Sequence, residues 1–251
     1  MAETILRIEG LSKRFGGVVA VDDVSLDVLP GEIHALIGPN GAGKTTIVHH
    51  LSGALPPDAG RIVFDGRDIT RLAVHQRVAL GLARSYQITS IFRRFTVLDN
   101  FALAVQARSG SSLAFWRPLA AEGALFDEAR RLVAEVGLAG SEDALAGNLA
   151  HGAQRQLEVG LALATRATIL LLDEPTAGMG PEEAQRMIAF LQRLKGSVTI
   201  LLIEHDMDAV FRLADRISVL VNGRVIATGL PADIRANAEV RRAYLGEEAL
   251  A

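Results

Sequence analysis

The stretch GPNGAGKTT, Gly38 to Thr46, decides the fold of this chain. Its first eight residues match the pattern G-x-x-x-x-G-K-[ST]. It follows IHALIG, Ile33 to Gly38, an apolar run typical of a short buried strand, and a helix is predicted after it from about Lys44 to Leu51. In this arrangement of strand, loop and helix, backbone N–H groups surround an anion and the helix dipole attracts it. The stretch therefore predicts a site for a phosphate-bearing ligand.

All residues of this loop are candidate contacts to the phosphates. They are Gly38, Pro39, Asn40, Gly41, Ala42, Gly43, Lys44, Thr45 and Thr46. The lysine is predicted to reach the β- and γ-phosphates, and the first threonine hydroxyl to ligate Mg²⁺. A glycine-rich turn with a chance lysine is the alternative, but average residue usage produces this pattern in only about one chain in a hundred of this length. Nucleotide binding is the favoured interpretation.

A pair of carboxylates ends the apolar run ILLLDEP, Ile169 to Pro175. At the carboxyl edge of a parallel sheet, Asp173 would lie beside the phosphate loop and hold Mg²⁺ through water. Glu174 would then orient or deprotonate an attacking water. The alternative is that both carboxylates cap a following helix. The presence of the phosphate loop favours the catalytic interpretation.

Composition and charge exclude several classes of protein. The chain has 251 residues, of which 49% are hydrophobic, with a formal charge of -3 and no cysteine. Neither a nucleic-acid surface nor a disulfide or zinc–thiolate site is expected. The N-terminal MAETILRIEG lacks the pattern of a secretory signal, and no apolar run approaches the roughly 18 to 20 residues of a spanning helix. We expect a cytoplasmic protein that meets a membrane only through a partner.

Several antiparallel strands are predicted from alternating apolar residues and from turn signals. They lie in Ile5–Phe15 and Val18–Val28, in Arg61–Ile69 with Asp65-Gly66 as a break, and in Val219–Gly229 with Asn222-Gly223 as a hairpin turn. The runs ATILLLDE and SVTILLIEH are typical of buried parallel strands, with a helix PEEAQRMIAFLQRL between them. These elements predict an α/β fold.

The middle of the chain, from about Phe95 to Ala164, is rich in Ala, Leu, Arg and Glu at helical spacing. TVLD, Thr96 to Asp99, resembles a capping box at the start of a helix that runs to about Ala107. A second helix is predicted over Phe126–Val136. This region is therefore expected to form a helical subdomain.

The order and spacing of the motifs carry a family resemblance. Asp173 lies 129 residues after Lys44, too far for a small GTPase or a nucleoside kinase, and there is no N-K-x-D motif to bind guanine. LAHGAQRQLEVGLAL precedes the carboxylate strand, and IEHD follows the next strand. In this order the chain resembles the nucleotide-binding subunits of ABC transporters, over essentially its whole length to YLG at Tyr244–Gly246.

The resemblance implies a P-loop NTPase (RecA-like) core with an N-terminal antiparallel β subdomain and an inserted α-helical subdomain. One ABC ATPase domain would cover residues 1–251, with residues 1–87 and 165–251 in the core and residues 88–164 in the helical subdomain. ATP and Mg²⁺ are the implied cofactors, and ATP hydrolysis is the implied activity.

The resemblance also implies roles for three further side chains. Phe15 would stack on adenine, Gln87 would contact Mg²⁺ and the attacking water, and His205 would contact the γ-phosphate. In isolation, these residues would be interpreted as a core aromatic, a surface glutamine and a structural histidine.

The stretch LAHGAQ, Leu149 to Gln154, aligns with the family signature L-S-G-G-Q, which contacts the γ-phosphate held by a second subunit. Gly152 is retained, so close backbone approach and the helix dipole are expected to remain. Ala150 has no hydroxyl, and losing one hydrogen bond to a charged group costs roughly 1.5 to 3 kcal/mol. His151 either replaces the missing donor or, as we favour, is an exposed histidine at the start of a helix.

This altered signature, together with QR after it, E-P-x-A-G-M, IEHDM and the final YLG, resembles the ABC branch that imports branched-chain amino acids and related small solutes. The resemblance implies an unlike ATPase partner with an intact signature, integral-membrane permeases and, indirectly, an extracytoplasmic solute-binding protein. It implies a peripheral location at the cytoplasmic face of the inner membrane. Gly180 stands where the dimer-contact loop usually has Asn or Asp.

Other interpretations stay open at this point. Urea, amides and aromatic acids are alternatives to leucine-type cargo. A homodimeric ATPase for lipid or lipopolysaccharide transport, a soluble non-transport ABC ATPase and a catalytically silent regulator are alternative functions. The apolar segment ITSIFRRF, Ile88 to Phe95, is predicted to dock coupling helices of a permease.

Overall fold

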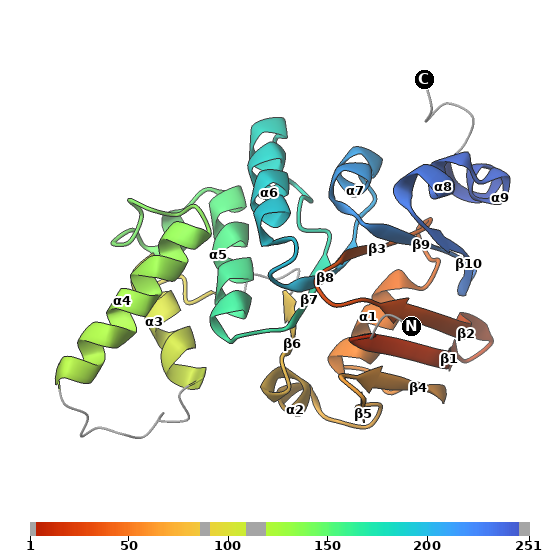
Figure 1. Ribbon diagram of the computed structural model, residues 1–251, viewed down its shortest axis with the longest axis horizontal. Helices are drawn as coiled ribbons and strands as arrows, with labels where there is room; N and C mark the ends of the chain where they lie inside the picture. The colour runs from red at the N-terminus through yellow and green to blue at the C-terminus, as the bar shows by residue number, and fades with distance from the viewer. Residues whose placement is uncertain (1–3, 86–90, 109–118, 246–251) are drawn as a thin grey trace. The chain divides into compact units, whose positions relative to one another are not determined.

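The computed structural model describes residues 4–85, 91–108 and 119–245 (Figure 1). The chain divides into two compact units. Unit 1 consists of Met1–Arg84, Thr168–Glu174 and Leu194–Ala251, and unit 2 of Ser85–Ala167 and Pro175–Arg193. The boundaries of the helical subdomain at residues 88 and 164 stay a prediction.

Strands and helices follow one another in the order that Figure 1 labels. The strands are β1 (Leu6–Phe15), β2 (Val18–Val28), β3 (Ile33–Ile37), β4 (Ala59–Phe64), β5 (Arg67–Asp68), β6 (Leu82–Ser85), β7 (Ile169–Asp173), β8 (Thr199–Ile203), β9 (Arg216–Val221) and β10 (Arg224–Gly229). The helices are α1 (Lys44–Ser52), α2 (Val74–Ala79), α3 (Val97–Arg108), α4 (Leu119–Glu135), α5 (His151–Ala164), α6 (Pro181–Leu194), α7 (Met207–Leu213), α8 (Pro231–Ala236) and α9 (Ala238–Val240). Short turns of other helix types are η1 (Ala146–Asn148) and η2 (Arg241–Leu245). None of the described helices combines the length and the apolar composition that crossing a bilayer requires.

Unit 1 contains two sheets. The antiparallel sheet has the order β2-β1-β4-β5, and its β1–β2 hairpin pairs Leu6 with Val28 and Phe15 with Val18. The predicted break at Asp65-Gly66 separates β4 from β5, because Asp65 has φ 47° and Gly66 has φ 71°. Both local predictions are confirmed.

The second sheet has the order β10-β9-β3-β8-β7-β6, in which β9, β3, β8 and β7 run parallel to one another. The parallel register pairs Leu36 and Asp173 with Ile203, so β3, β7 and β8 end at the same level. The chain segments that leave these three strands therefore begin at one edge of the sheet. Asn222 and Gly223, both with positive φ, close the antiparallel β9–β10 hairpin as predicted.

Helix α1 lies between the two sheets, and one apolar core joins all three layers. Ile47 and Leu51 of α1 pack there with Leu36 of β3 and Ile8 of β1. The opposite face of the parallel sheet is covered by α7, α8 and α9, which pack on residues such as Ile37. Since successive strand residues face opposite sides, β3 contributes to both cores.

Unit 2 consists mainly of α3, α4, α5 and most of α6, and within it α3 packs against α4 and α5. The predicted capping box at the start of α3 is present: the Asp99 N–H donates to Thr96 Oγ1 (3.0 Å), and the Thr96 N–H donates to Asp99 Oδ2 (3.3 Å). Helix α4 begins at Leu119, seven residues before the predicted start at Phe126. Gly123 lowers the helical signal of that first turn, and the structure nevertheless includes it in the helix.

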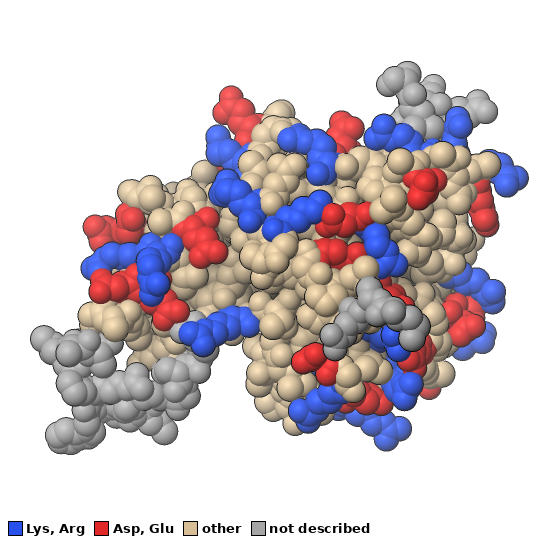
Figure 2. Space-filling view, in the orientation of Figure 1, with Lys and Arg blue, Asp and Glu red and all other residues tan. Residues whose placement is uncertain are grey.

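On the face shown in Figure 2, basic and acidic side chains are interspersed. This distribution agrees with the formal charge of -3.

Candidate functional site

The loop after β3 depends on glycine at two positions. Gly38 has φ 152° and Gly43 has φ 106°. A Cβ on Gly38 would collide with the carbonyl oxygen of Leu220, and a Cβ on Gly43 would collide with that of Ala20. Because α1 begins at Lys44, the loop ends at a helix N-terminus, where the dipole favours an anion.

Lys44 folds back over this loop. Its Nζ donates to the carbonyl oxygens of Gly38 (2.6 Å) and Pro39 (3.0 Å), and the residue is only 9% exposed. Burial lowers the pKa of Lys44, and the negative charges of Glu174 and Asp173 oppose that shift. The ammonium group therefore lies within electrostatic reach of both predicted catalytic carboxylates.

Glu174 leaves β7 with an unusual backbone conformation. Its φ of 47° is rare for a residue other than glycine, and its N–H donates to the carbonyl oxygen of Ile203 (2.9 Å). Such conformations persist where the surrounding structure enforces them, often at functional sites. Helix α6 begins only at Pro181, so the alternative in which Asp173 and Glu174 cap that helix is wrong.

His205 lies next to Glu174 at the same sheet edge. His205 Nδ1 is 3.6 Å from Glu174 Oε1, and the two side chains are 60% and 30% exposed. After it, the Asp206 side chain accepts hydrogen bonds from the backbone N–H groups of Asp208 and Ala209 and caps α7. The tertiary structure thus brings two predicted site residues together from different strands.

Asp173 is nearly buried and forms an ion pair with Arg84, a residue that sequence analysis did not single out. Arg84 Nη2 is 3.1 Å from Asp173 Oδ2. The two residues are 89 positions apart in the chain, so only the pairing of distant segments reveals the contact.

The oxygen donors at this edge fit Mg²⁺ bound together with a nucleotide. Among the residues described, no group of three or more His, Cys, Asp or Glu side chains could hold a metal by itself. Mg²⁺ in nucleotide sites is held by one or two protein oxygens and by phosphate oxygens. The Thr45 hydroxyl, at an exposed position in the first turn of α1, and the Asp173 carboxylate are donors of that kind.

Phe15, at the end of β1, is 49% exposed, so the alternative of a core aromatic is wrong. Lys13 Nζ lies 5.6 Å from the centroid of its ring. The hairpin that carries Phe15 borders the phosphate loop, because the Ala20 carbonyl approaches Gly43. Gln87 lies outside the described residues, and its role stays a prediction.

The altered signature opens α5. Ala150 is the N-cap and has no side-chain hydrogen bond to offer, and His151 is exposed at the first helical position, as favoured from the sequence. Gly152 is buried. A side chain of α5 itself fixes the loop before the helix, because Gln154 Nε2 donates to the Leu149 carbonyl oxygen (2.8 Å).

Glu183 of α6 supplies the cap that Ala150 lacks. Its Oε1 accepts from the Gly152 N–H (3.3 Å), and its Oε2 accepts from the Gly180 N–H (3.4 Å). One carboxylate therefore connects the signature stretch with the predicted dimer-contact loop. Sequence analysis did not identify it, because a second glutamate in the first turn of a helix is ordinary.

Glu183→Ala is expected to reduce the free energy of unfolding by about 1 kcal/mol, the typical cost of losing a helix N-cap. Chemical denaturation measures this change, and hydrogen exchange of the Gly152 amide reports it locally. Glu182→Ala is the matched control. Glu182 is 92% exposed, and its ion pair with Arg186 is long, at 3.9 Å. Equal stability and equal Gly152 exchange in both variants would contradict a capping role.

Two family models match this chain. The model described as ABC transporter matches residues 21–177, and the model described as branched-chain amino acid ATP-binding cassette transporter matches residues 224–249. The first match includes the phosphate loop, the signature stretch and the carboxylate pair.

Curated relatives align over nearly the whole chain. The high-affinity branched-chain amino acid transport ATP-binding protein LivG of Salmonella typhimurium is 39% identical, over 98% of this chain and 100% of its own length. LivG of Escherichia coli and BraF of Pseudomonas aeruginosa, which carry the same description, are each 38% identical with the same coverage.

Solved structures show the same fold. A nucleotide-free ATP-binding cassette from an ABC transporter superposes with a TM-score of 0.82 at 29% identity. The ADP conformation of an ATP-binding cassette of an ABC transporter superposes with a TM-score of 0.82 at 30% identity. Each covers 98% of this chain and 100% of its own. The predicted P-loop NTPase fold is thereby confirmed.

Proposed function

Since this chain belongs to the ABC transporter family as an ATP-binding, ATP-hydrolysing subunit, we propose that it powers an importer of branched-chain amino acids or related small solutes. The match to the branched-chain amino acid model over residues 224–249 carries the choice of cargo class. That segment contains none of the predicted catalytic residues, so ATP chemistry shared by all ABC ATPases does not account for the match.

The C-terminal segment nevertheless lies near the phosphate loop. Burial raises the pKa of the Tyr244 phenol, and a hydrogen bond with the backbone of Gly38 opposes that shift. Tyr244 also packs on the core that contains Ile37 and Ile234. Tyr244, which lies within the segment that the branched-chain amino acid model matches, thus borders the nucleotide-binding loop.

The chemistry that we propose uses three groups at one sheet edge. Lys44 would release the Gly38 and Pro39 carbonyls and donate to phosphate oxygens, where its charge stabilises the transferred group. Glu174 would accept a proton from, or orient, the water that attacks the γ-phosphate. His205, already beside Glu174, would hold that geometry and donate to the γ-phosphate. Mg²⁺ would neutralise phosphate charge, with Thr45 and Asp173 as its protein oxygens.

The altered signature supports an asymmetric pair of ATPase subunits. Ala150 offers no hydroxyl to a partner's γ-phosphate, whereas the phosphate loop, Glu174 and His205 of this chain are complete. In a pair of unlike subunits, the site around this phosphate loop would face an intact signature of the partner. Only the partner's nucleotide would meet the altered one.

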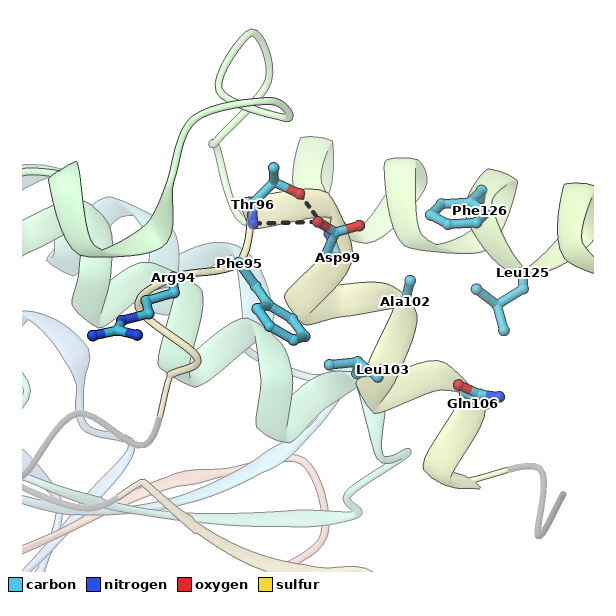
Figure 3. A pocket seen from close by; sticks show the side chains of 9 residues that line it. All are labelled: Arg94, Phe95, Thr96, Asp99, Ala102, Leu103, Gln106, Leu125 and Phe126. Carbon is cyan, nitrogen blue, oxygen red and sulfur yellow. Dashed lines mark hydrogen bonds between the residues drawn. The ribbon is translucent and has the colours of Figure 1, made fainter. Parts of the chain in front are cut away.

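We further propose that a permease coupling helix docks on unit 2, next to two exposed aromatic residues. Phe92 and Phe95 are 57% and 44% exposed, and their rings stack with centroids 5.5 Å apart. Beside them lies a pocket of about 350 Å³. Its lining residues are Arg94, Phe95, Thr96, Asp99, Ala102, Leu103, Gln106, Leu125 and Phe126 (Figure 3). A pocket lined by apolar side chains together with Arg94 and Asp99 fits an amphipathic helix.

Affinity capture of the tagged chain from native membranes, followed by mass spectrometry, tests the proposed function. We expect a second ATPase with an intact L-S-G-G signature and two unlike permeases, which would also place this chain at the membrane. Recovery of this chain as the only ATPase would overturn the asymmetric importer and favour the homodimeric alternative.

The docking surface gives a separate expectation. Phe92→Ser together with Phe95→Ser should lower permease recovery about tenfold or more, because aromatic anchors dominate interface energy. ATP binding by the isolated chain should be unchanged. Leu230→Ser is the matched control, since Leu230 is 58% exposed in unit 1. Equal permease recovery with the aromatic variant and the control would exclude this surface.

A further inference from the structure

A buried ion pair occupies the carboxyl edge of the parallel sheet beside the phosphate loop. Arg84 lies in β6, the edge strand next to β7, and its Nη2 is 3.1 Å from Asp173 Oδ2. The side chains of Arg84 and Asp173 are only 8% and 4% exposed. A surface ion pair would be screened by water, but this pair is shielded from it.

The pair has a clear physical role when no cation is bound at Asp173. A buried carboxylate without a counter-charge is costly, and it becomes protonated or draws in a cation. The guanidinium of Arg84 supplies that charge from within the chain. It also holds one carboxylate oxygen in a defined direction, because a planar guanidinium bonds carboxylates with fixed geometry.

The electrostatic influence of the pair extends to α1. Burial lowers the pKa of His49, the positive charge of Arg84 lowers it further, and the negative charge of Asp173 raises it. Lys44, at the start of the same helix, is under the opposing influence of Asp173 and Glu174. Lys44 and Arg84 therefore both act on the Asp173 carboxylate, one from the phosphate loop and one from the edge strand.

We propose that Arg84 is a positioning residue that neutralises Asp173 before Mg²⁺–nucleotide binds, and that it thereby sets the Mg²⁺ concentration the site requires. The inference rests on the proposed function, in which Asp173 is a Mg²⁺ ligand. Arg84 and Mg²⁺ carry like charges and share one carboxylate. Arg84 therefore weakens Mg²⁺ binding while it keeps the empty site stable and Asp173 oriented.

The test measures Mg²⁺-dependent nucleotide binding without any hydrolysis readout. Fluorescence polarisation of mant-ATP is followed while free Mg²⁺ is varied, for wild type, Arg84→Gln and Arg84→Lys. We expect Arg84→Gln to need about tenfold less free Mg²⁺ for half-saturation, equal to about 1.4 kcal/mol. Arg84→Lys keeps the positive charge but not the planar guanidinium, so its half-saturating free Mg²⁺ should lie between those of Arg84→Gln and wild type.

The outcomes separate this inference from the proposed function. If wild type does not bind mant-ATP at all, the proposed function fails. If wild type binds it and Arg84→Gln needs the same or more Mg²⁺, the role of Arg84 is overturned and the ion pair is only structural.

If the Arg84→Gln protein is too unstable to titrate, a comparison of thermal stability tests the same role. The double variant Arg84→Gln with Asp173→Asn also removes the charge of the carboxylate that loses its Arg84 ion pair in the single variant. We expect the double variant to unfold at a higher temperature than Arg84→Gln alone. A double variant that is less stable than the single one would show that Arg84 does not act through Asp173.

Discussion

Replacing Glu174 with glutamine is expected to stop ATP hydrolysis in the assembled transporter while ATP stays bound. Glutamine keeps the size of the side chain and one acceptor oxygen, so the φ of 47° and the hydrogen bond from the Glu174 N–H to Ile203 remain possible. It cannot take a proton from the attacking water. Loss of a general base slows turnover by about 10²- to 10⁴-fold. Phosphate release and the amount of retained ATP are the two measurements.

A glutamate far from the sheet edge provides the control. Glu135, the exposed last residue of α4, should tolerate the same substitution without any change in turnover. Rapid hydrolysis by Glu174→Gln would remove Glu174 from the catalytic role. Loss of both ATP binding and hydrolysis would show instead that the substitution damages the nucleotide site as a whole.

Replacing Lys44 with methionine is expected to weaken ATP binding by about 100-fold or more. Hydrogen bonds to charged groups contribute about 1.5 to 3 kcal/mol each, and the ammonium would make at least two of them to phosphate oxygens. Methionine keeps most of the aliphatic stem, so the packing of the buried part of the side chain is retained. Titration with mant-ATP measures the affinity, and thermal unfolding confirms that the variant is folded.

Lys195→Met is the control for this second prediction. Lys195 is 42% exposed and forms an ion pair with Asp215 (2.8 Å) away from the phosphate loop. Its loss should leave the affinity for ATP within about twofold, because exposed ion pairs contribute little. Unchanged ATP affinity in Lys44→Met would contradict nucleotide binding by this loop.

Most of the fold was predictable because its signals are local. Asn222 and Gly223 require positive φ values that only a tight turn uses, so the β9–β10 hairpin follows from two neighbouring residues. The capping pair Thr96 and Asp99 is equally local. Short elements such as β6 and α7 were not predicted, since four to seven residues carry too little periodicity to distinguish a helix from a strand.

The candidate site was predictable in its parts and only partly in its contacts. The phosphate loop, Asp173 and Glu174 were identified from residue types and their order, and His205 from the family resemblance. Arg84 and Glu183 were not, because an arginine in a strand and a glutamate in a first helical turn carry no functional signal. Each acquires a role through a partner that is distant in the chain.

The sequence by itself determined the α/β class, the phosphate loop and the resemblance to ABC ATPases, because glycine spacing, apolar periodicity and motif order are properties of neighbouring residues. Only the tertiary structure decided which charges meet. The parallel register of β3, β7 and β8 brings their carboxyl ends to one edge, where Glu174 lies beside His205, and β6 brings Arg84 to Asp173. Such contacts depend on strand order and register, which the hydrogen bonds of the sheet set only when distant segments pair.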